Sequence, residues 1–275
     1  MKKTLLSALA LGIAVSFSSQ VAAVDPEQSR MDLIEYFKAK TPDRPIEDYI
    51  NGIYGYDEDR RMQWEAGEEF PPYLDALDEG KAIYDKDLAT YQKCFGEDVT
   101  KVRASFPRFN EETKKVEVLE QMINKCRKDA GLKEYGNTGQ DMAKLSGYLA
   151  YEARGEIINV ELNSVEAKQA FAAGERFYIE PRGQLGLSCA SCHVYNASRK
   201  ARSDILSPVI GHNSHFPAWR LNSSRLVTLQ GRYTGCQRNM RAAPSAVFGD
   251  DYNNMELFTA YMSNGLEING PSIRQ

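Results

Sequence analysis

Apolar residues recur every three or four positions along much of the chain, a spacing typical of helices that bury one face. This pattern predicts helices at residues 28–40, 112–132, 140–153, 164–178 and 253–264. The alternating pattern of half-buried strands is scarce. The sequence therefore predicts a mainly α-helical protein.

Two long segments depart from the helical pattern. Residues 41–74 are rich in Asp, Glu, Pro and Tyr, and we expect them to pack as an extension over the rest of the protein. Residues 194–225 contain Pro208, Gly211 and Pro217 among many Ser and Asn residues, a composition typical of loops.

Two parts of the chain repeat one another in the same order. EGKAIYDKDLATYQKC (79–94) and AGERFYIEPRGQLGLSC (173–189) share Gly-x-x-x-Tyr, followed by a cysteine ten or eleven residues after the tyrosine. Residues 145–160 and 257–270 each place a tyrosine in an apolar helical pattern that ends at glycine, a common helix C-cap. Each half thus predicts an opening helix, a cysteine site, loops and a closing helix, as a tandem duplication would produce.

The first residues have the features of a secretory signal peptide. Lys2 and Lys3 are followed by an apolar run at 5–17 and by the small residues of the Val-Ala-Ala sequence at 21–23. The run is too short to anchor the protein in a bilayer. We expect residues 1–23 to be removed, and the mature protein to reside in the periplasm without a membrane span.

The duplication and the signal peptide divide the chain into parts. We expect an N-terminal extension at 24–74, a first domain at 75–160 and a second domain at 161–275. The net charge of −4 becomes −6 when the two lysines of the signal peptide are removed. An acidic exported protein of this kind is a poor candidate for binding nucleic acid.

One short motif carries the clearest chemistry. Cys189-Ala-Ser-Cys192-His193 has the spacing by which c-type cytochromes attach haem. A zinc site would usually add a second Cys-x-x-Cys or His-x-x-x-His pair, and a thioredoxin-like motif would need a βαβ context; the sequence has neither. We therefore predict one covalent haem c, with both thiols as thioether anchors and His193 as the proximal iron ligand.

The first half has lost this motif. After Cys94, Glu97 stands in place of the second cysteine and Asp98 in place of the histidine, so neither covalent attachment nor iron ligation is expected there. Cys94 and Cys126 are then left over. In an oxidising compartment a disulfide between them is the simplest outcome, and two free thiols are the alternative. The loop that it closes, about thirty residues long, would contribute about 3–4 kcal/mol of stability.

The residues alone do not identify the sixth ligand of the haem iron. Cytochromes c often use methionine, and Met240, Met255 and Met262 are available, although methionine also fills cores. His212 and His215 are further candidates. Cys236 is the odd cysteine, close in sequence to several arginines. It is either a buried inert thiol, a partner in an intermolecular disulfide, or an iron ligand held as thiolate.

Longer motifs make the chain resemble a known family. FYIEPRGQLGLSCASCH, HFPAWRL, RYTGCQRNMR and LAYEARGEIINV are similar to segments of SoxA, the catalytic cytochrome subunit of the SoxAX complex of thiosulfate oxidation. The resemblance covers roughly residues 75–265. Because the first half lacks its haem motif, the chain resembles the single-haem type, in which a disulfide replaces the first haem.

The resemblance implies a function and a set of site residues. SoxA-like proteins join thiosulfate to a cysteine of the SoxYZ carrier and pass two electrons through haem to a SoxX-like monohaem cytochrome, their heterodimer partner. By motif position, Cys236 would be the distal iron ligand that carries the sulfur chemistry. Arg232 would bind the anionic substrate, and Arg182 would support a haem propionate.

Two other functions remain open. A plain periplasmic electron carrier would use methionine as its iron ligand and Cys236 only structurally. A thiosulfate dehydrogenase would form tetrathionate, but this class usually carries a second Cys-x-x-Cys-His motif in the same chain, and the sequence contains only one.

Overall fold

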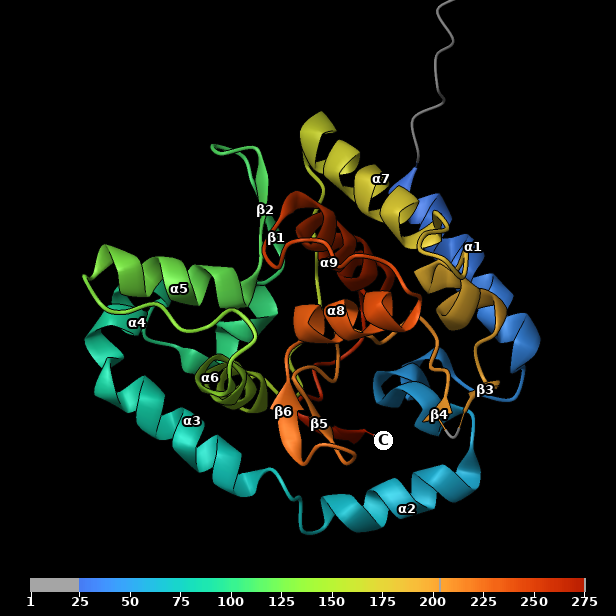
Figure 1. Ribbon diagram of the computed structural model, residues 1–275, viewed down its shortest axis with the longest axis horizontal. Coiled ribbons are helices and arrows are strands. Elements are labelled where there is room, and N and C mark those ends of the chain that lie inside the picture. The colour runs from blue at the N-terminus through green and yellow to red at the C-terminus, as the bar shows by residue number, and fades with distance from the viewer. Residues whose placement is uncertain (1–24, 203, 275) are drawn as a thin grey trace, which may run out of the picture.

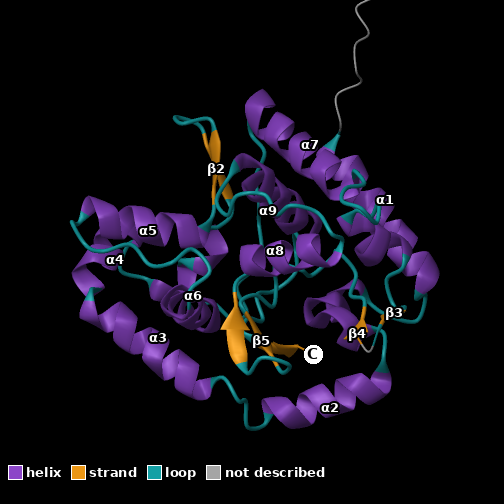
Figure 2. Cartoon of the chain, viewed as in Figure 1, coloured by secondary structure: helices purple, strands orange, loops and turns teal. Residues whose placement is uncertain are grey.

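A computed structural model describes residues 25–202 and 204–274, and the predicted signal peptide lies outside them. Helices dominate the described chain, as the sequence predicts, and strands are few and short (Figure 2). The first half contains α3 (Leu74–Lys86), α4 (Leu88–Phe95), α5 (Leu119–Asp129) and α6 (Gln140–Glu152). The second half contains α7 (Val165–Ile179), α8 (Leu229–Asn239) and α9 (Asp250–Met262).

The two halves repeat one arrangement (Figure 1). In the first, α3 crosses α6, and in the second, α7 crosses α9. A glycine makes each crossing close: a Cβ on Gly80 would lie 2.2 Å from the Lys144 carbonyl oxygen, and one on Gly174 would lie 2.0 Å from the Asn254 carbonyl oxygen. These are the glycines of the repeated Gly-x-x-x-Tyr pattern. The duplicated pattern therefore marks a duplicated helix crossing.

A hairpin precedes the next-to-last helix of each half. Strands β1 (Arg108–Asn110) and β2 (Lys115–Glu117) pair antiparallel before α5, and β5 (Ala218–Arg220) and β6 (Arg225–Val227) pair antiparallel before α8. A cis peptide precedes each hairpin, at Pro107 and at Pro217. The C-terminal strand β7 (Ser272–Arg274) then adds to β5 in parallel. Strands β3 (Lys200–Ala201) and β4 (Asp204–Ile205) form a separate small ribbon.

Two predicted segments differ from the structure. The single helix predicted at 112–132 is instead the end of the first hairpin followed by α5, because the polar turn before β2 includes Lys114 in a left-handed conformation (φ 54°). Helix α8 was not predicted. Its sequence LQGRYTGCQRN has two glycines and few apolar residues, so its burial pattern is weak.

The segment before α3 contacts both halves. It contains the 3₁₀ segment η1 (Ile46–Gly55) and α2 (Glu58–Glu68), and it follows α1 (Pro26–Lys40). The hydroxyl of Tyr54 donates to the Ile273 carbonyl oxygen over 3.2 Å, and the Trp64 indole donates to Ser272 Oγ over 3.0 Å. These bonds join the extension to the C-terminal strand.

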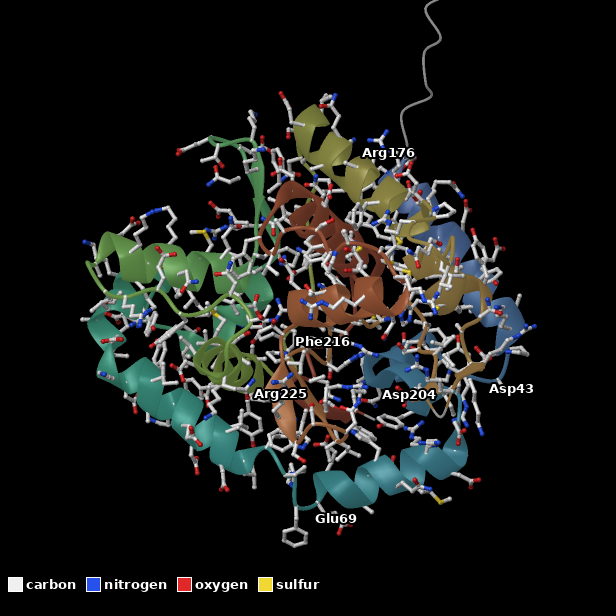
Figure 3. The ribbon with its side chains drawn as sticks, viewed as in Figure 1. Asp43, Glu69, Arg176, Asp204, Phe216 and Arg225 are labelled. Atoms are coloured by element: carbon white, nitrogen blue, oxygen red, sulfur yellow. A yellow bond between two sulfur atoms is a disulfide. The ribbon has the colours of Figure 1, made fainter. Side chains whose placement is uncertain are left out.

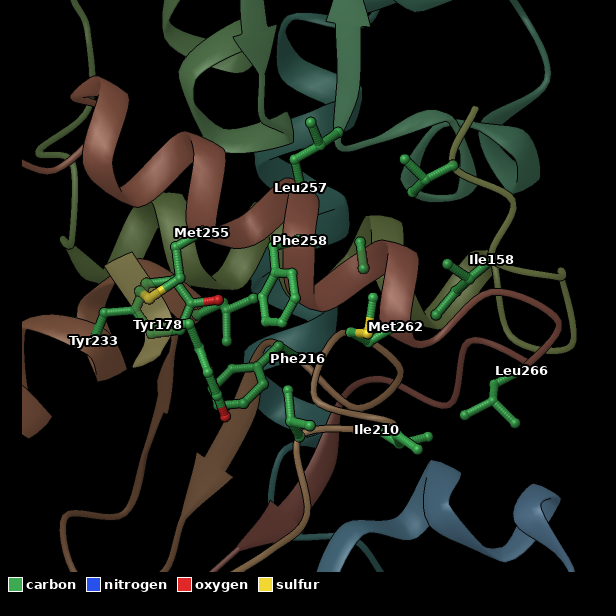
Figure 4. Close-up of a cluster of buried hydrophobic side chains, with 14 of the residues drawn as sticks. Ile158, Tyr178, Ile210, Phe216, Tyr233, Met255, Leu257, Phe258, Met262 and Leu266 are labelled. Atoms are coloured by element: carbon green, nitrogen blue, oxygen red, sulfur yellow. The ribbon is translucent and has the colours of Figure 1, made fainter. Parts of the chain in front are cut away.

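A disulfide joins Cys94 at the end of α4 to Cys126 on α5, with their Cα atoms 6.1 Å apart. The predicted pairing is confirmed. In the second half the apolar core surrounds α7 and α9, where Tyr178, Met255, Phe258 and Met262 are buried together (Figure 4). Across residues 25–202 and 204–274, no helix is both long enough and apolar enough to cross a membrane.

Candidate functional site

A cavity of about 370 Å³ lies in the second half, within the range of ligand-binding pockets. Most of the predicted haem-site residues line it: Cys189, Cys192, His193, Arg232 and Cys236. The extension contributes Ile53, Tyr54 and Arg60 to its wall. The cavity is therefore enclosed by the second half together with the extension.

The Cys-x-x-Cys-His motif begins a short helical turn. Ser188 and Ser191 exchange two hydrogen bonds of 3.0 Å, each from a backbone N–H to the other hydroxyl, and these start the turn η4 (Ser191–Tyr195). Both motif cysteines are unpaired and partly exposed. Burial, reinforced by the Cys236 sulfur, raises the pKa of Cys189 to about 12, and burial raises the pKa of Cys192. Two neutral thiols thus face the cavity from one turn.

His193 is oriented by a backbone carbonyl. Its Nδ1 lies 2.8 Å from the Ser207 carbonyl oxygen, so Nδ1 carries the proton and donates, and Nε2 is left as the lone-pair nitrogen. Burial lowers the pKa of His193 to about 4, although the Ser207 bond opposes the shift. A neutral imidazole with one nitrogen fixed by hydrogen bonding is the usual state of a metal-ligating histidine.

The two other candidate histidines also line the cavity. The His212 ring meets the His193 ring edge to face, with centroids 4.6 Å apart, and its Nε2 is 3.2 Å from Ser207 Oγ. The buried His215 Nδ1 has no hydrogen-bond partner. Burial lowers the pKa of both rings well below the usual value, so both are neutral.

Helix α8 brings Arg232 and Cys236 into the cavity. Thr228 Oγ1 accepts from the Gly231 N–H over 3.3 Å and starts the helix. The four-residue spacing places Arg232 and Cys236 on one helix face. Two electrostatic effects agree with this placement: the Arg232 charge lowers the pKa of His193, and the Cys236 charge raises that of Cys189. Cys236 is unpaired, so a thiol and a cation share one wall.

Of the three candidate methionines and Arg182, two methionines line the cavity and the other residues lie elsewhere. Met240 and Met255 line the cavity, and Met255 Sδ lies 3.8 Å from Cys189 Sγ, whereas Met262 belongs to the apolar core. Arg182 lines a different, neighbouring cavity of about 680 Å³. Its guanidinium stacks on the Phe177 ring at 3.5 Å and donates to the Phe177 carbonyl, and its Nη1 is buried without a partner.

Arg220 and Arg274 are two of the cavity-wall arginines that were not predicted. Neither belongs to a motif with a recognisable spacing. Arg220 is the next-to-last residue of the quoted segment HFPAWRL, and Arg274 is the next-to-last residue of the chain. The two come together only through the pairing of their strands.

The residues present fit a covalently bound haem and not a metal cluster. Within the described parts of the chain, no group of three or more His, Cys, Asp or Glu side chains is arranged to hold a metal ion. Two thiols and a fixed imidazole in one turn are the attachment set of haem c. A largely helical domain with this set at an enclosed cavity is a c-type cytochrome domain.

The chain belongs to the SoxA/TsdA cytochrome c family. The model of that family, described as SoxA/TsdA, cytochrome c domain, matches residues 79–158 and 173–268. The two matched segments fall one in each half, which agrees with the duplication. Membership of this family implies a covalently bound haem c.

Relatives and a solved structure resemble the chain over most of its length. L-cysteine S-thiosulfotransferase subunits SoxA from Chlorobaculum tepidum and Allochromatium vinosum are 38% and 36% identical, covering 100% and 98% of both chains respectively. The crystal structure of SoxXA from P. pantotrophus has a TM-score of 0.66 at 31% identity, over 74% of this chain and 79% of that chain.

Proposed function

We propose that this protein is the catalytic cytochrome subunit of an L-cysteine S-thiosulfotransferase of periplasmic sulfur oxidation. The observation that carries the proposal is the shared cavity: the Cys-x-x-Cys-His turn lines it from one segment, and Cys236 with Arg232 lines it from α8. An attachment site and an unpaired thiol are thus held together, beside a cation.

The proposed roles follow from this arrangement. Cys189 and Cys192 anchor one haem c, His193 is the proximal ligand through Nε2, and Cys236 is the distal ligand and the sulfur that reacts. Arg182 supports a propionate from the neighbouring cavity. One haem is proposed because the first half lacks Cys-x-x-Cys-His and its two cysteines are bonded to each other.

The reaction joins two sulfur atoms and releases two electrons. Cys236 Sγ bonds to the outer sulfur of thiosulfate, with loss of the thiol proton and of two electrons. The carrier cysteine thiol then attacks that outer sulfur, the bond to Cys236 breaks, and the carrier proton passes to the Cys236 sulfur. When bound, the haem supplies the route for these electrons. Arg232 offers a fork of N–H donors to the dianion and draws it towards Cys236. Because thiosulfate carries two negative charges, a cation beside the thiol raises its local concentration.

The acceptor and the carrier are proposed from the relatives. We propose a SoxX-like monohaem cytochrome as the heterodimer partner that takes the electrons, and a SoxYZ-like carrier that supplies the cysteine. The signal peptide predicted at 1–23 supports export to the periplasm.

The test replaces Cys236 by alanine in the haem-loaded complex. Thiosulfate-dependent reduction of the partner cytochrome, measured with the SoxYZ carrier, should fall by at least about 100-fold, because the reacting sulfur is gone. Haem content and chemical reduction by dithionite should not change. Full turnover by Cys236→Ala would contradict the mechanism.

A plain electron carrier is the second candidate, because Met240 and Met255 also line the cavity. Low-temperature electron paramagnetic resonance of the oxidised protein separates the two. A thiolate-type low-spin signal that disappears in Cys236→Ala supports the transferase. A His/Met-type signal that disappears in Met240→Leu or Met255→Leu supports the carrier. Tetrathionate formation without SoxYZ would indicate a thiosulfate dehydrogenase.

A further inference from the structure

The wall of the haem cavity carries more positive charge than its own carboxylates balance. Within the described residues, the only acidic side chain that lines the cavity is Asp204, whereas the arginines are Arg60, Arg202, Arg220, Arg232 and Arg274. Buried cations are costly unless a negative group pairs with them. The cavity is therefore built around an anionic ligand.

Arg274 is the most deeply buried of these arginines. Its side chain is only 7% exposed, and its Nη1 donates to the Ile273 carbonyl over 2.7 Å and to Ser272 Oγ over 2.8 Å. Its Nε and Nη2 are buried without any hydrogen-bond partner, and the guanidinium lies over the Tyr54 ring. No carboxylate lies within ion-pair distance of it in the described residues. Arg274 Nε and Nη2 are thus two hydrogen-bond donors at the cavity wall without an acceptor.

The pairing of β5 with β7 places a second guanidinium beside the first. Arg220 and Arg274 are direct partners in the parallel register, so their side chains project from the same face of the sheet. Burial and the charges of Arg232 and Arg274 lower the pKa of Arg220 to about 10. Asp204 reaches Arg220 only at 3.7 Å. Two like charges held side by side favour an oxyanion bound between them.

We propose that Arg274, together with Arg220, forms an oxyanion site that holds a propionate carboxylate of the haem. The proposal rests on the proposed function, in that it takes the cavity to hold haem. The flat guanidinium fork matches a carboxylate in geometry, and Nε with Nη2 is one of its two-donor edges.

The surroundings of Arg274 favour a permanent ligand over an exchanging substrate. A Cβ on Gly52 of the extension would lie 3.8 Å from Arg274 Nε, so the extension covers this corner of the cavity. Arg232, one helical turn from Cys236, is thus the arginine left for thiosulfate.

Glu68 holds Arg274 in place from outside the cavity. Its Oε1 accepts from the Ile273 N–H and from the Trp64 indole, each over 2.9 Å, and its other oxygen accepts from the Tyr73 hydroxyl. The carboxylate therefore fastens β7 to the extension, and its charge favours the charged form of Arg274 without a direct ion pair. Glu68 is a positioning residue for this site.

The test compares Arg274→Gln with Arg274→Lys in the haem-loaded complex. In Arg274→Gln the resonance Raman band for propionate bending should shift, and the haem midpoint potential should become more negative, because a nearby positive charge that favours the reduced form is lost. The KM for thiosulfate should stay within twofold of wild type. Arg274→Lys should restore the potential in part, since it keeps the charge but not the fork.

Arg225→Gln is the matched control. Arg225 lies on β6 opposite Arg220 in the same sheet, but its side chain is exposed and does not line the cavity (Figure 3). This variant should change neither the Raman band nor the potential.

Two results would overturn the assignment. An unchanged propionate band with a tenfold higher KM for thiosulfate would mean that the site binds substrate. If the propionate band, the haem midpoint potential and the KM for thiosulfate all stay unchanged, Arg274 has only a structural role. If Arg274→Gln does not accumulate with haem, the propionate band of Arg274→Lys is measured instead. A shifted band supports the assignment, and an unchanged band contradicts it. Both spectroscopic measurements use the resting protein, so they are independent of the turnover assay with Cys236→Ala that tests the proposed function.

Discussion

Cys126 and Cys236 occupy matching positions in the two halves, each as the eighth residue of its helix, α5 or α8. Their chemistry differs. Cys126 is bonded to Cys94, whereas Cys236 is unpaired at the cavity, where its charge acts on Cys189. In the first half, the Cys94–Cys126 disulfide therefore stands at the position that corresponds to the cavity of the second half.

The disulfide is expected to stabilise the first half. It closes a loop with a sequence separation of 32, and replacement of Cys126 by serine should lower the free energy of unfolding by about 3–4 kcal/mol. Urea unfolding followed by circular dichroism measures the change. Cys94→Ser and the double variant should lose about as much as Cys126→Ser, because all three lack one bond. Additive losses in the double variant would contradict this reading.

At the scale of elements, the glycines at the two helix crossings set how closely the helices approach. Gly174→Ala should lower the free energy of unfolding by about 1–3 kcal/mol, because its Cβ would meet the Asn254 carbonyl oxygen at 2.0 Å and α7 must move away from α9. Gly80→Ala should act in the same way at the first crossing. Thermal unfolding of the purified variants provides the measurement.

Gly235→Ala is the control within a helix. A Cβ there meets nothing within 4 Å, so alanine should stabilise α8 by about 0.5–1 kcal/mol through its better helix propensity. Equal losses in the free energy of unfolding for Gly80→Ala, Gly174→Ala and Gly235→Ala would show that close helix packing is not the cause.

The helices were predictable from sequence where one face is apolar. Helices α6, α7 and α9 match their predicted ranges closely, because their buried residues recur at helical spacing. Helix α8 was not predictable, because its burial depends on polar contacts such as those of Gln230, whose amide donates to Asn253 and Glu256. The hairpins were missed because strands of three residues are too short to show alternation.

The candidate site was predictable where its residues share one motif. The Cys-x-x-Cys-His turn could be identified by its spacing, and the roles of Arg232 and Cys236 by the resemblance of their segment to a known family. Arg220 and Arg274 could not, since they are brought together only by the parallel pairing of β5 and β7. The part played by the extension in the cavity wall depends likewise on contacts between segments far apart in the chain.

At the scale of the whole molecule, a buried carboxylate pair lies between the two halves. Glu256 of α9 is 1% exposed and accepts from Gln230 Nε2 over 3.1 Å, and Glu120 of α5 accepts from Ser146 Oγ over 2.6 Å. Burial, followed by the charge of Glu120, raises the pKa of Glu256 to about 8, while the charge of Arg103 opposes the shift. The junction therefore favours a protonated Glu256.

This junction predicts a pH-dependent stability. The folded state holds the Glu256 proton more tightly than the unfolded state, so stability should decline as the pH rises from about 4.5 to about 8 and then level off. Glu256→Gln should remove this decline and stabilise the protein by about 1–3 kcal/mol above pH 8, with little effect near pH 4.5. Urea unfolding at several pH values, with the exposed Glu267→Gln as control, tests this. Parallel profiles for wild type and Glu256→Gln would refute it.

The matching sulfur positions also impose an order on the maturation of the protein. Cys94 and Cys126 must be oxidised, whereas their counterparts Cys189 and Cys236 must remain reduced until haem is attached. After the proposed export, all of them meet the same oxidant on one chain. An oxidant that reaches the second half before haem is attached would join Cys189 to Cys236 in a disulfide, as Cys94 is joined to Cys126. The chain would then fold without its cofactor. The yield of working protein thus depends on a race between thiol oxidation and haem attachment.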